Sequence, residues 1–359
     1  MIDDYNFEDR KLVEIVKATY FNPKIVVIDE TTTALSQEGR EELYKHMERI
    51  RKSGNTVIFI SHDLPEIIEK SDTITILRDG VYIDTVKSKD VNENDLKKLM
   101  VGREVTGDYY RSDYGEKISD EVVLSAKHVT VPGLIEDVSF DLHKGEILGF
   151  GGLSESGMHE IGKAIFGASY DREGTVELAD GTQINDIPTA IKHSIAYTSK
   201  DRDNESVVLN QSIGDNICLP SLDELSGPAH LISDKKKKDF ANKFAKQMSV
   251  KMVDVNQFVS NLSGGNKQKV VLARWIGKDS DIVVLDSPTR GIDIKVKQDI
   301  YQLMNQMRKN GKSIIMISEE LMELIGMCDR IMIMKDGKIS GELERDQNLD
   351  ENGLITMMV

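Results

Sequence analysis

The sequence predicts an α/β protein in which a mostly parallel sheet is flanked by helices, present in one and a half copies. The first observation is an internal repeat, because residues 25–84 align without a gap on residues 282–341 at a constant offset of 257. The second is the alternation of short β-branched runs with helical patterns in each copy, which indicates parallel strands joined by helices. A period this long indicates two homologous domains, since solenoid repeats span only about 20–50 residues.

Each copy contains three apolar runs that are short, rich in β-branched residues and bounded by turn-forming residues, which predicts buried strands. These runs are 25–28, 57–60 and 74–77 in the first copy, and 282–285, 314–317 and 331–334 in the second. Between the first two runs, Gly39–Lys52 places Leu43, Met47 and Ile50 at helical spacing and therefore predicts a helix.

The second copy also has elements that the first copy does not show. Residues 121–144 have the pattern of antiparallel strands, 146–150 form a strand that leads into the glycine-rich Gly151–Gly157, and a helix follows to Phe166. At the offset of 257 their counterparts would precede Met1, so we expect the first domain to lack them. Such a domain should be poorly stable by itself, because its sheet lacks a core strand and its covering elements.

The expected domain organisation follows from this comparison. Residues 1–100 should be the C-terminal part of a first domain, and 101–119 a polar linker. Residues 120–359 should be a second domain, with a helical subdomain at about 205–275.

Composition excludes some classes of function. The net charge of −15 disfavours nucleic acid as the main ligand, because phosphate backbones require a basic surface. No run approaches the ~18 apolar residues of a membrane span, and Met1 leads into an acidic stretch unlike a signal peptide. Cys218 and Cys328 are far apart in sequence, which favours a reducing compartment without a disulfide framework.

Two acidic residues follow the first apolar run. Asp29 and Glu30 stand where the strand is expected to end. An aspartate there can hold Mg²⁺, and an adjacent carboxylate can orient and deprotonate an attacking water molecule. Acidic pairs at strand ends can also be purely structural, so a second motif is needed before a catalytic role can be inferred.

The second signal is the sequence Leu262–Gly265 (LSGG) ahead of a helical pattern. Ser263 suits the N-cap position, and Gly264 and Gly265 allow close approach of the backbone to a ligand. The start of a helix offers free N–H groups to an anion. The motif precedes a strand that ends in Asp286, which makes a chance match improbable.

In this order the motifs resemble those of the ATP-binding subunit of an ABC transporter. The segments are the glycine-rich loop, the LSGG signature, the Walker B strand, the D-loop and the switch-histidine segment that contains His62. The phrases LSGGNKQKVVLARW, SPTRGID and GEILGFGGL are similar to sugar importers of the ribose, galactose and xylose type. The resemblance implies a P-loop NTPase fold of ABC type with an antiparallel β subdomain and a helical subdomain, and ATP and Mg²⁺ as cofactors. Two nucleotide-binding domains of one chain would clamp two ATP molecules head to tail.

The site on the second domain's phosphate loop departs from the family pattern. Gly152 and Gly157 keep the GxxxxG spacing, but Met158 and His159 follow where the family has Lys and Ser or Thr. Losing one charge-assisted phosphate contact costs on the order of 1.5–3 kcal/mol. Three further positions differ: Ser287 follows Asp286 in place of a glutamate, Glu319 replaces the switch histidine, and Lys200 replaces a glutamine or glutamate. The loop could still bind ATP weakly without cleaving it.

The site that contains Glu30 and His62 shows the opposite pattern, because its catalytic residues are present. The resemblance assigns catalysis to Glu30 and His62, the metal to Asp29, and nucleotide contacts to the signature residues Ser263, Gly264 and Gly265. We therefore expect one catalytic and one degenerate site, with the phosphate loop of the catalytic site ahead of Met1.

The resemblance implies an ATP hydrolase coupled to sugar import at the cytoplasmic face of the membrane. Its partners would be two permease subunits and an extracytoplasmic sugar-binding protein. One alternative is a truncated or split-gene fragment without independent ATPase activity. Another is a soluble tandem ABC protein acting on ribosomes or DNA, which the short linker and the acidic charge disfavour.

Overall fold

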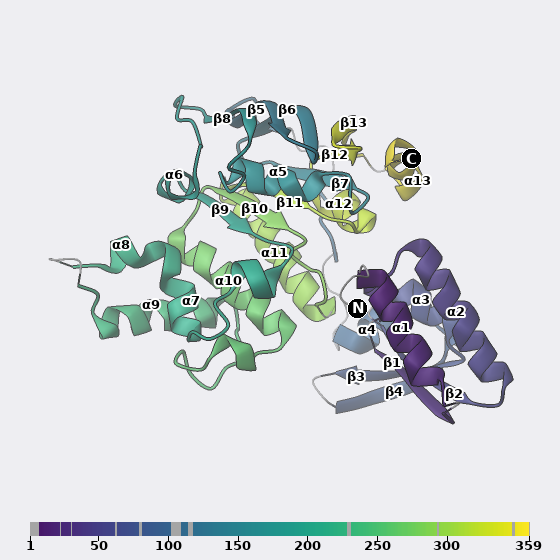
Figure 1. Ribbon diagram of the computed structural model, residues 1–359. Helices are drawn as coiled ribbons and strands as arrows, with labels where there is room; N and C mark the ends of the chain where they lie inside the picture. The colour runs from purple at the N-terminus through teal and green to yellow at the C-terminus, as the bar shows by residue number, and fades with distance from the viewer. Residues whose placement is uncertain are drawn as a thin grey trace. The chain divides into compact units, whose positions relative to one another are not determined.

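The computed structural model divides into two compact units, and each is described by itself (Figure 1). One consists of Met1–Gly107 with Asp293–Lys295, and the other of Asp108–Ile292 with Val296–Val359. The structure describes residues 7–21, 23–29, 31–61, 63–78, 81–101, 109–113, 118–227, 231–292, 294–346 and 349–358.

The first unit contains two separate pairs of strands. Its elements are α1 (Phe7–Thr19), β1 (Ile25–Asp29), η2 (Thr31–Ala34), α2 (Gln37–Lys52), β2 (Thr56–Ile60), α3 (Leu64–Lys70), β3 (Thr73–Arg78), β4 (Val81–Lys87), η3 (Ser88–Asp90) and α4 (Glu93–Val101). Strands β1 and β2 pair in parallel, whereas β3 and β4 form an antiparallel pair. Helix α2 begins two residues before the predicted start, because Ser36 caps it and accepts a hydrogen bond from the backbone N–H of Gly39.

The prediction that the first-copy strands are fully buried is wrong. Along β1 the buried Val26 and Ile28 alternate with Ile25 and Val27, which are each 59% exposed. On β2, Ile58 and Ile60 are also exposed. One face of this sheet packs on a small core that includes Leu35, Leu43 and Met47, and the other face is uncovered.

The second unit holds a complete six-stranded sheet in the order β13-β12-β7-β11-β10-β9. All neighbours are parallel except the edge strand β13, which is antiparallel to β12. A second, three-stranded antiparallel sheet has the order β6-β5-β8. The strands are β5 (Val122–Val131), β6 (Ile135–His143), β7 (Ile147–Gly152), β8 (Glu173–Leu178), β9 (Ile195–Thr198), β10 (Ile282–Asp286), β11 (Ser313–Ile317), β12 (Arg330–Lys335) and β13 (Lys338–Glu344).

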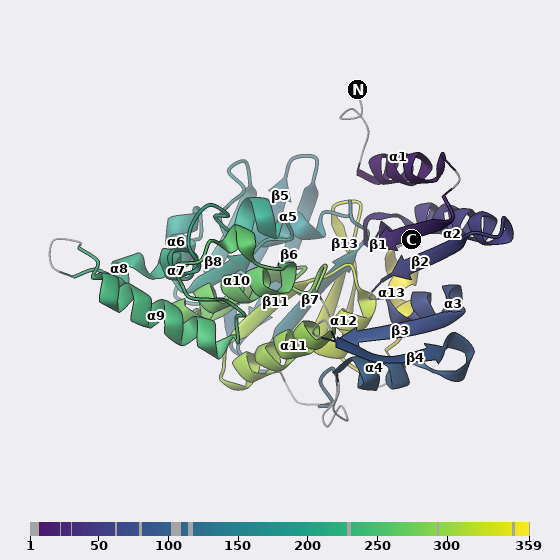
Figure 2. The same cartoon turned by 90° about the horizontal axis from the view of Figure 1, so that it is seen from below.

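Helices cover this sheet and form a group at one end of the unit. Figures 1 and 2 both show α7, α8, α9 and α10 gathered there, within the range expected for a helical subdomain. The helical elements are α5 (Met158–Ile165), α6 (Ile187–Lys192), η4 (Arg202–Ser206), α7 (Ile213–Cys218), η5 (Leu219–Ser221), α8 (Leu222–Leu225), α9 (Asp234–Gln247), η7 (Val259–Asn261), α10 (Gly264–Lys278), α11 (Ile294–Lys309), α12 (Leu321–Met327) and α13 (Glu351–Met358).

Comparison of the repeats shows what β7 does. At the offset of 257, β1 and β2 correspond to β10 and β11, and β3 and β4 correspond to β12 and β13. In the second unit β7 lies between β11 and β12 and joins these two pairs into one sheet. Among the described residues of the first unit, no strand joins the two pairs.

Helix α5 explains the difference in burial between the copies. Its Gly162 lies so close to the sheet that an added Cβ would be 2.9 Å from Ile317 and 3.4 Å from Val284. Val284 and Ile317 are fully buried, whereas their counterparts Val27 and Ile60 are exposed. The helix that follows the phosphate loop is thus the cover that this face of a sheet requires.

Part of the predicted linker packs into the second unit. Arg111 is 4% exposed and donates hydrogen bonds to Asp113 at 2.8 Å and to Asp329 at 2.7 Å. The ring of Tyr110 lies against Gly326, where any Cβ would clash with it. A buried ion pair and an aromatic contact hold this stretch, so polar composition alone did not indicate its packing.

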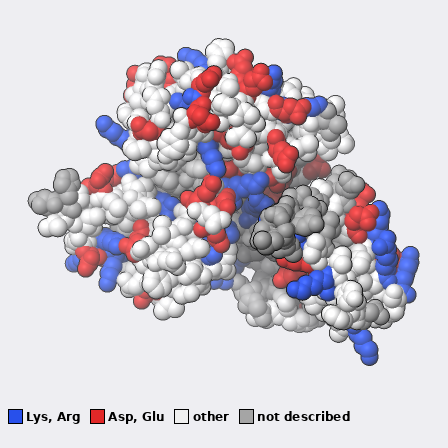
Figure 3. All heavy atoms as spheres, viewed as in Figure 1, with Lys and Arg blue, Asp and Glu red and all other residues white. Residues whose placement is uncertain are grey.

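No helix in the described part of the chain is long and apolar enough to cross a membrane. Cys218 and Cys328 are both buried free thiols. Acidic and basic side chains are interspersed over the face shown in Figure 3.

Candidate functional site

The glycine-rich loop of the second unit has the backbone of a phosphate loop. Strand β7 ends at Gly152, and α5 begins after Gly157, whose φ of +89° favours glycine. A Cβ on Gly152 would lie 2.7 Å from the carbonyl oxygen of Met334, so this glycine is required by close packing. The first turn of α5 leaves backbone N–H groups free to bind an anion.

The two residues after this loop have different surroundings. Met158 is fully buried in the hydrophobic core, so its side chain does not face a ligand. His159 is 7% exposed and lines a cavity of about 610 Å³. Of these two side chains, only the histidine is in a position to act in the site.

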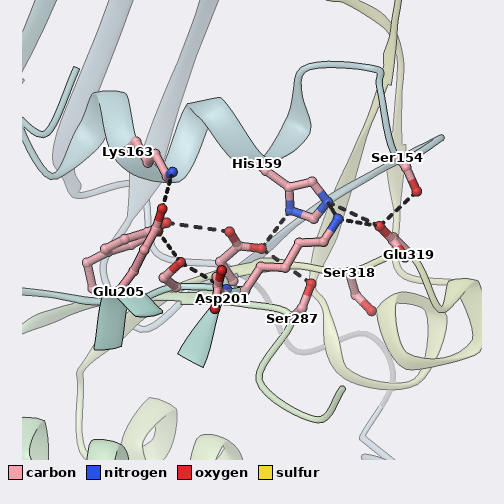
Figure 4. A network of polar contacts seen from close by, with 12 residues as sticks. Ser154, His159, Lys163, Asp201, Glu205, Ser287, Ser318 and Glu319 are labelled. Atoms are coloured by element: carbon pink, nitrogen blue, oxygen red, sulfur yellow. Dashed lines mark hydrogen bonds and ion pairs between the residues drawn. The ribbon is translucent and has the colours of Figure 1, made fainter. Parts of the chain in front are cut away.

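His159 is the centre of a polar network (Figure 4). Its Nδ1 lies 2.7 Å from Oδ1 of Asp286, and its Nε2 lies 3.3 Å from Oε1 of Glu319. Glu319 also accepts hydrogen bonds from Lys200 at 2.8 Å and from Ser154 at 3.0 Å. The network therefore joins the phosphate loop, the Walker B strand, the switch position and the segment after β9.

The charges in this network stabilise one another. The hydrogen bond from His159 lowers the pKa of Glu319 far below its usual range, against the effect of burial, and Lys200 and Ser154 add to this. Burial lowers the pKa of His159, but the hydrogen bonds to Asp286 and Glu319 outweigh it and raise the pKa overall. Each of the four segments is thus bound to the next by a charge-assisted hydrogen bond.

Ser287 follows Asp286 at the position where the family resemblance implies a catalytic glutamate. Its backbone has a φ of +49°, and its Oγ donates to Oδ1 of Asp286 at 3.3 Å. A hydroxyl group at this position cannot act as the general base that a carboxylate provides.

The signature residues lie at the start of α10, where Gly264 is close to Arg202 and Gly291 of the cavity lining. Ser263 is the N-cap residue as predicted, but its side chain accepts a hydrogen bond from Nδ2 of Asn266 at 2.9 Å and makes no capping hydrogen bond to the backbone. None of Ser263, Gly264 and Gly265 lines the cavity.

In the first unit, the structure describes the residues that flank Glu30 and His62, the two residues to which the resemblance assigns catalysis. Glu30 and His62 themselves lie outside the described residues. Asp29 ends β1 and is exposed. After His62, Asp63 is the N-cap residue of α3 and accepts a hydrogen bond from the backbone N–H of Glu66 at 3.1 Å.

A buried glutamate hub is present in both units, and the sequence analysis missed it. Glu66 and Glu323 correspond at the offset of 257, and both are buried. Each accepts hydrogen bonds from three hydroxyl groups: Thr32, Tyr44 and Ser61 in the first unit, and Thr289, Tyr301 and Ser318 in the second. All eight residues are identical between copies, and this identity was the signal that could have revealed the hub.

A second missed residue is Arg274, on α10. It is 6% exposed, and burial lowers its pKa to about 10. It donates to the carbonyl oxygens of Ser206 and Asn216, both at 2.7 Å. Arg274 thereby ties the signature helix to η4, which carries part of the cavity lining.

The two strand-end aspartates differ in their fit to Mg²⁺. Magnesium keeps several waters and takes one or two carboxylates, so the exposed Asp29 is compatible with it. Asp286 is 1% exposed, and His159 and Ser287 both hydrogen-bond its Oδ1. Within the described residues, no group of three or more His, Cys, Asp or Glu side chains could hold a metal ion.

These features define an ABC-type nucleotide-binding protein, and comparison with known proteins agrees. The sequence profile of the ABC transporter family matches residues 135–290. The ribose import ATP-binding protein RbsA of Lactococcus lactis is 40% identical over 352 residues, which cover 98% of this chain and 70% of that protein. The xylose import ATP-binding protein XylG of Thermoanaerobacter pseudethanolicus is 42% identical over 350 residues, with 94% and 68% covered.

A solved bacterial ABC transporter cassette, in its dimeric form, shares the fold. It superposes with a TM-score of 0.55 at 22% identity, covering 62% of this chain and 99% of the cassette. The chain belongs to the ABC transporter ATP-binding proteins, in the group that includes the ribose and xylose import proteins.

Proposed function

We propose that this chain is the ATP-hydrolysing subunit of an importer for simple sugars, with one catalytic and one degenerate site. The observation that carries the proposal is the contrast between Asp29 and Asp286. The first is an exposed carboxylate followed by Glu30, whereas the second is held by His159 and followed by Ser287. All these departures from the family pattern fall on one site, as expected if that site alone no longer had to hydrolyse ATP.

In this proposal, ATP binding draws the two nucleotide-binding domains together and hydrolysis at the Glu30 site separates them. Glu30 orients and deprotonates the attacking water, and His62 contacts the γ-phosphate. Asp29 would hold Mg²⁺, which neutralises charge on the β- and γ-phosphates when bound. The signature residues Ser263 and Gly264 bind the same nucleotide from the opposite domain through the start of α10.

The partners follow from the names of the relatives. Import ATP-binding proteins energise transport through a membrane, and two permease subunits with an extracytoplasmic sugar-binding protein complete the assembly we propose. The chain would then sit at the cytoplasmic face of the membrane. Nucleic acid is not a proposed ligand, since the net charge is −15.

The uncovered sheet face of the first unit supports the alternative that the chain has no independent ATPase activity. The exposed Val27 and Ile60 correspond to residues that α5 covers in the second unit, and no described strand joins the two strand pairs. A strand, phosphate loop and helix of the type formed by 147–165 would complete this unit. We therefore expect the chain purified alone to hydrolyse ATP slowly or not at all.

The test is ATP hydrolysis and sugar uptake by the complex assembled in vesicles with its permease and binding protein. Glu30→Gln should abolish both activities, because it removes the general base. Ser287→Ala, at the matched position of the other copy, should change either by less than about twofold. Equal losses from the two substitutions would refute the asymmetry, and co-sedimentation with ribosomes would refute a transport role.

A further inference from the structure

The second unit fills the position of a magnesium ion with its own side chains. By resemblance, position 159 carries the hydroxyl group that ligates the ion, and Asp286 is the acidic group beside it. Here the imidazole of His159 lies 2.7 Å from Asp286, and Ser287 also hydrogen-bonds the same oxygen. The hydroxyl group is therefore replaced, and Oδ1 of Asp286 is engaged twice, whereas Oδ2 has, among the described side chains, only the hydroxyl group of Tyr197 at 3.5 Å.

The contact of 2.7 Å with the Asp286 carboxylate requires Nδ1 to carry a proton, so the imidazole offers no free lone pair to a metal whether it is cationic or neutral. If His159 is cationic, both nitrogens donate, to Asp286 and to Glu319. If it is neutral and Nδ1 donates to Asp286, Nε2 accepts from Lys200, whose Nζ lies 3.1 Å away. The residues present therefore do not fit Mg²⁺ in either protonation state.

The cavity nevertheless keeps the groups that bind phosphate. The loop Gly152–Gly157 still leads into the start of α5, which offers N–H groups to an anion, and Ser154 lines the cavity. The N–H groups of Ser156 and Glu160 are already bonded within the loop. Lys200 and Arg290 also line it, and Arg290 has no ion pair among the described residues. Lysine and arginine side chains can neutralise phosphate oxygens directly.

We propose that the second unit binds a nucleoside triphosphate without a divalent metal ion, with Lys200 and Arg290 supplying the positive charge. His159 is the residue that excludes the metal, because it holds Asp286. This inference rests on the proposed degenerate character of the second site. It predicts a structural role for this nucleotide, since His159 engages Asp286 and Ser287 stands next to it in place of the glutamate.

The experiment is photo-labelling of the full chain with an azido-ATP analogue, in Mg²⁺ or in EDTA, followed by peptide mapping. Labelling of second-unit peptides within 147–209 should agree between the two conditions within about threefold, or about 0.7 kcal/mol. A larger loss in EDTA, or no labelling of these peptides in either condition, overturns the proposal. Peptide mapping assigns the signal to a unit, so nucleotide at the first unit does not confuse the result.

Substitutions test the assignment to individual residues. His159→Thr restores the hydroxyl group and frees Asp286, so labelling should become stronger in Mg²⁺ than in EDTA by more than about threefold. Continued metal independence of this variant overturns the role of His159. Lys200→Gln should weaken labelling in both conditions, which provides a second readout if His159→Thr folds poorly.

The matched control is His128→Asn. His128 makes the same kind of hydrogen bond, to Asp137 at 2.6 Å, but on the exposed surface away from the cavity. Its substitution should leave labelling unchanged. Transport that does not depend on Glu30 would overturn the proposed function and leave this labelling result intact, so the two failures are distinguishable.

Discussion

Replacing the buried hub carboxylate by an apolar side chain of similar size, Glu323→Leu, is expected to destabilise the second unit strongly. Glu323 is 1% exposed and accepts hydrogen bonds from Thr289, from Tyr301 at 2.5 Å and from Ser318 at 2.8 Å. Each buried hydroxyl group left without its acceptor costs about 1–3 kcal/mol. The charge of Lys297 remains paired in this variant, because its Nζ also lies 2.7 Å from Oε1 of Glu320.

These contributions do not add fully, because hydroxyl groups can rotate towards other acceptors. The loss expected for breaking a buried ionic network is about 3–5 kcal/mol. For a unit of this size, 1 kcal/mol shifts the melting temperature by about 2–4 °C, so Glu323→Leu should lower it by about 10 °C. Glu323→Gln keeps the shape and one acceptor oxygen, and should cost only about 1 kcal/mol.

The assay is hydrogen exchange of peptides from each unit, with thermal unfolding as a second measurement. Exchange is needed because two units that unfold separately do not give one two-state transition. Glu323→Leu should accelerate exchange in β11 and α12, whereas Glu66→Leu at the matched position should accelerate it only in the first unit. A Glu323→Leu protein within about 1 kcal/mol of the wild type would refute the hub as a source of stability.

Three further predictions concern other features. Arg274→Ala should destabilise the second unit by about 3 kcal/mol, because buried carbonyl oxygens lose a charged donor. Thermal unfolding will measure this loss of stability, and Arg274→Lys should give a smaller loss. The pKa of His159 is raised above 6.5 in the folded state, so its stabilisation is fully present below pH 6.5 and is lost as pH rises through the folded pKa. The stability difference between wild type and His159→Asn should therefore shrink in unfolding experiments above pH 6.5, and a difference that grows there would contradict the assigned charge. Val27→Lys on the exposed sheet face should change thermal stability by less than about 1 kcal/mol, whereas Val284→Lys at the matched buried position should unfold the second unit.

Motif positions could be predicted because they depend on local backbone requirements. Gly157 has positive φ and Gly152 has no room for a side chain, so both positions require glycine and their spacing in the sequence predicts the phosphate loop. Ser263 stands at the N-cap of α10 for the same kind of reason. Glu30 and His62 remain predictions, since they lie outside the described residues.

The hub and the network around His159 could not be predicted in the same way. Their members come from segments far apart in the chain, such as positions 159 and 286, and nothing in local sequence says that they meet. Asp286 read in isolation is an ordinary strand-end acid that could bind a metal. That the imidazole of His159 contacts Asp286 is visible only when α5 and β10 are brought together.

The sequence by itself determined the family and the repeat, because these depend on residue identity at fixed spacing, and the asymmetry of the two sites is a prediction from the same residues. Only the tertiary structure decided that β7 is the strand that joins two pairs into one sheet, and that α5 covers its face. The physical reason is that burial and charge pairing depend on which segments are neighbours in space, and this choice is made by the packing of the whole unit.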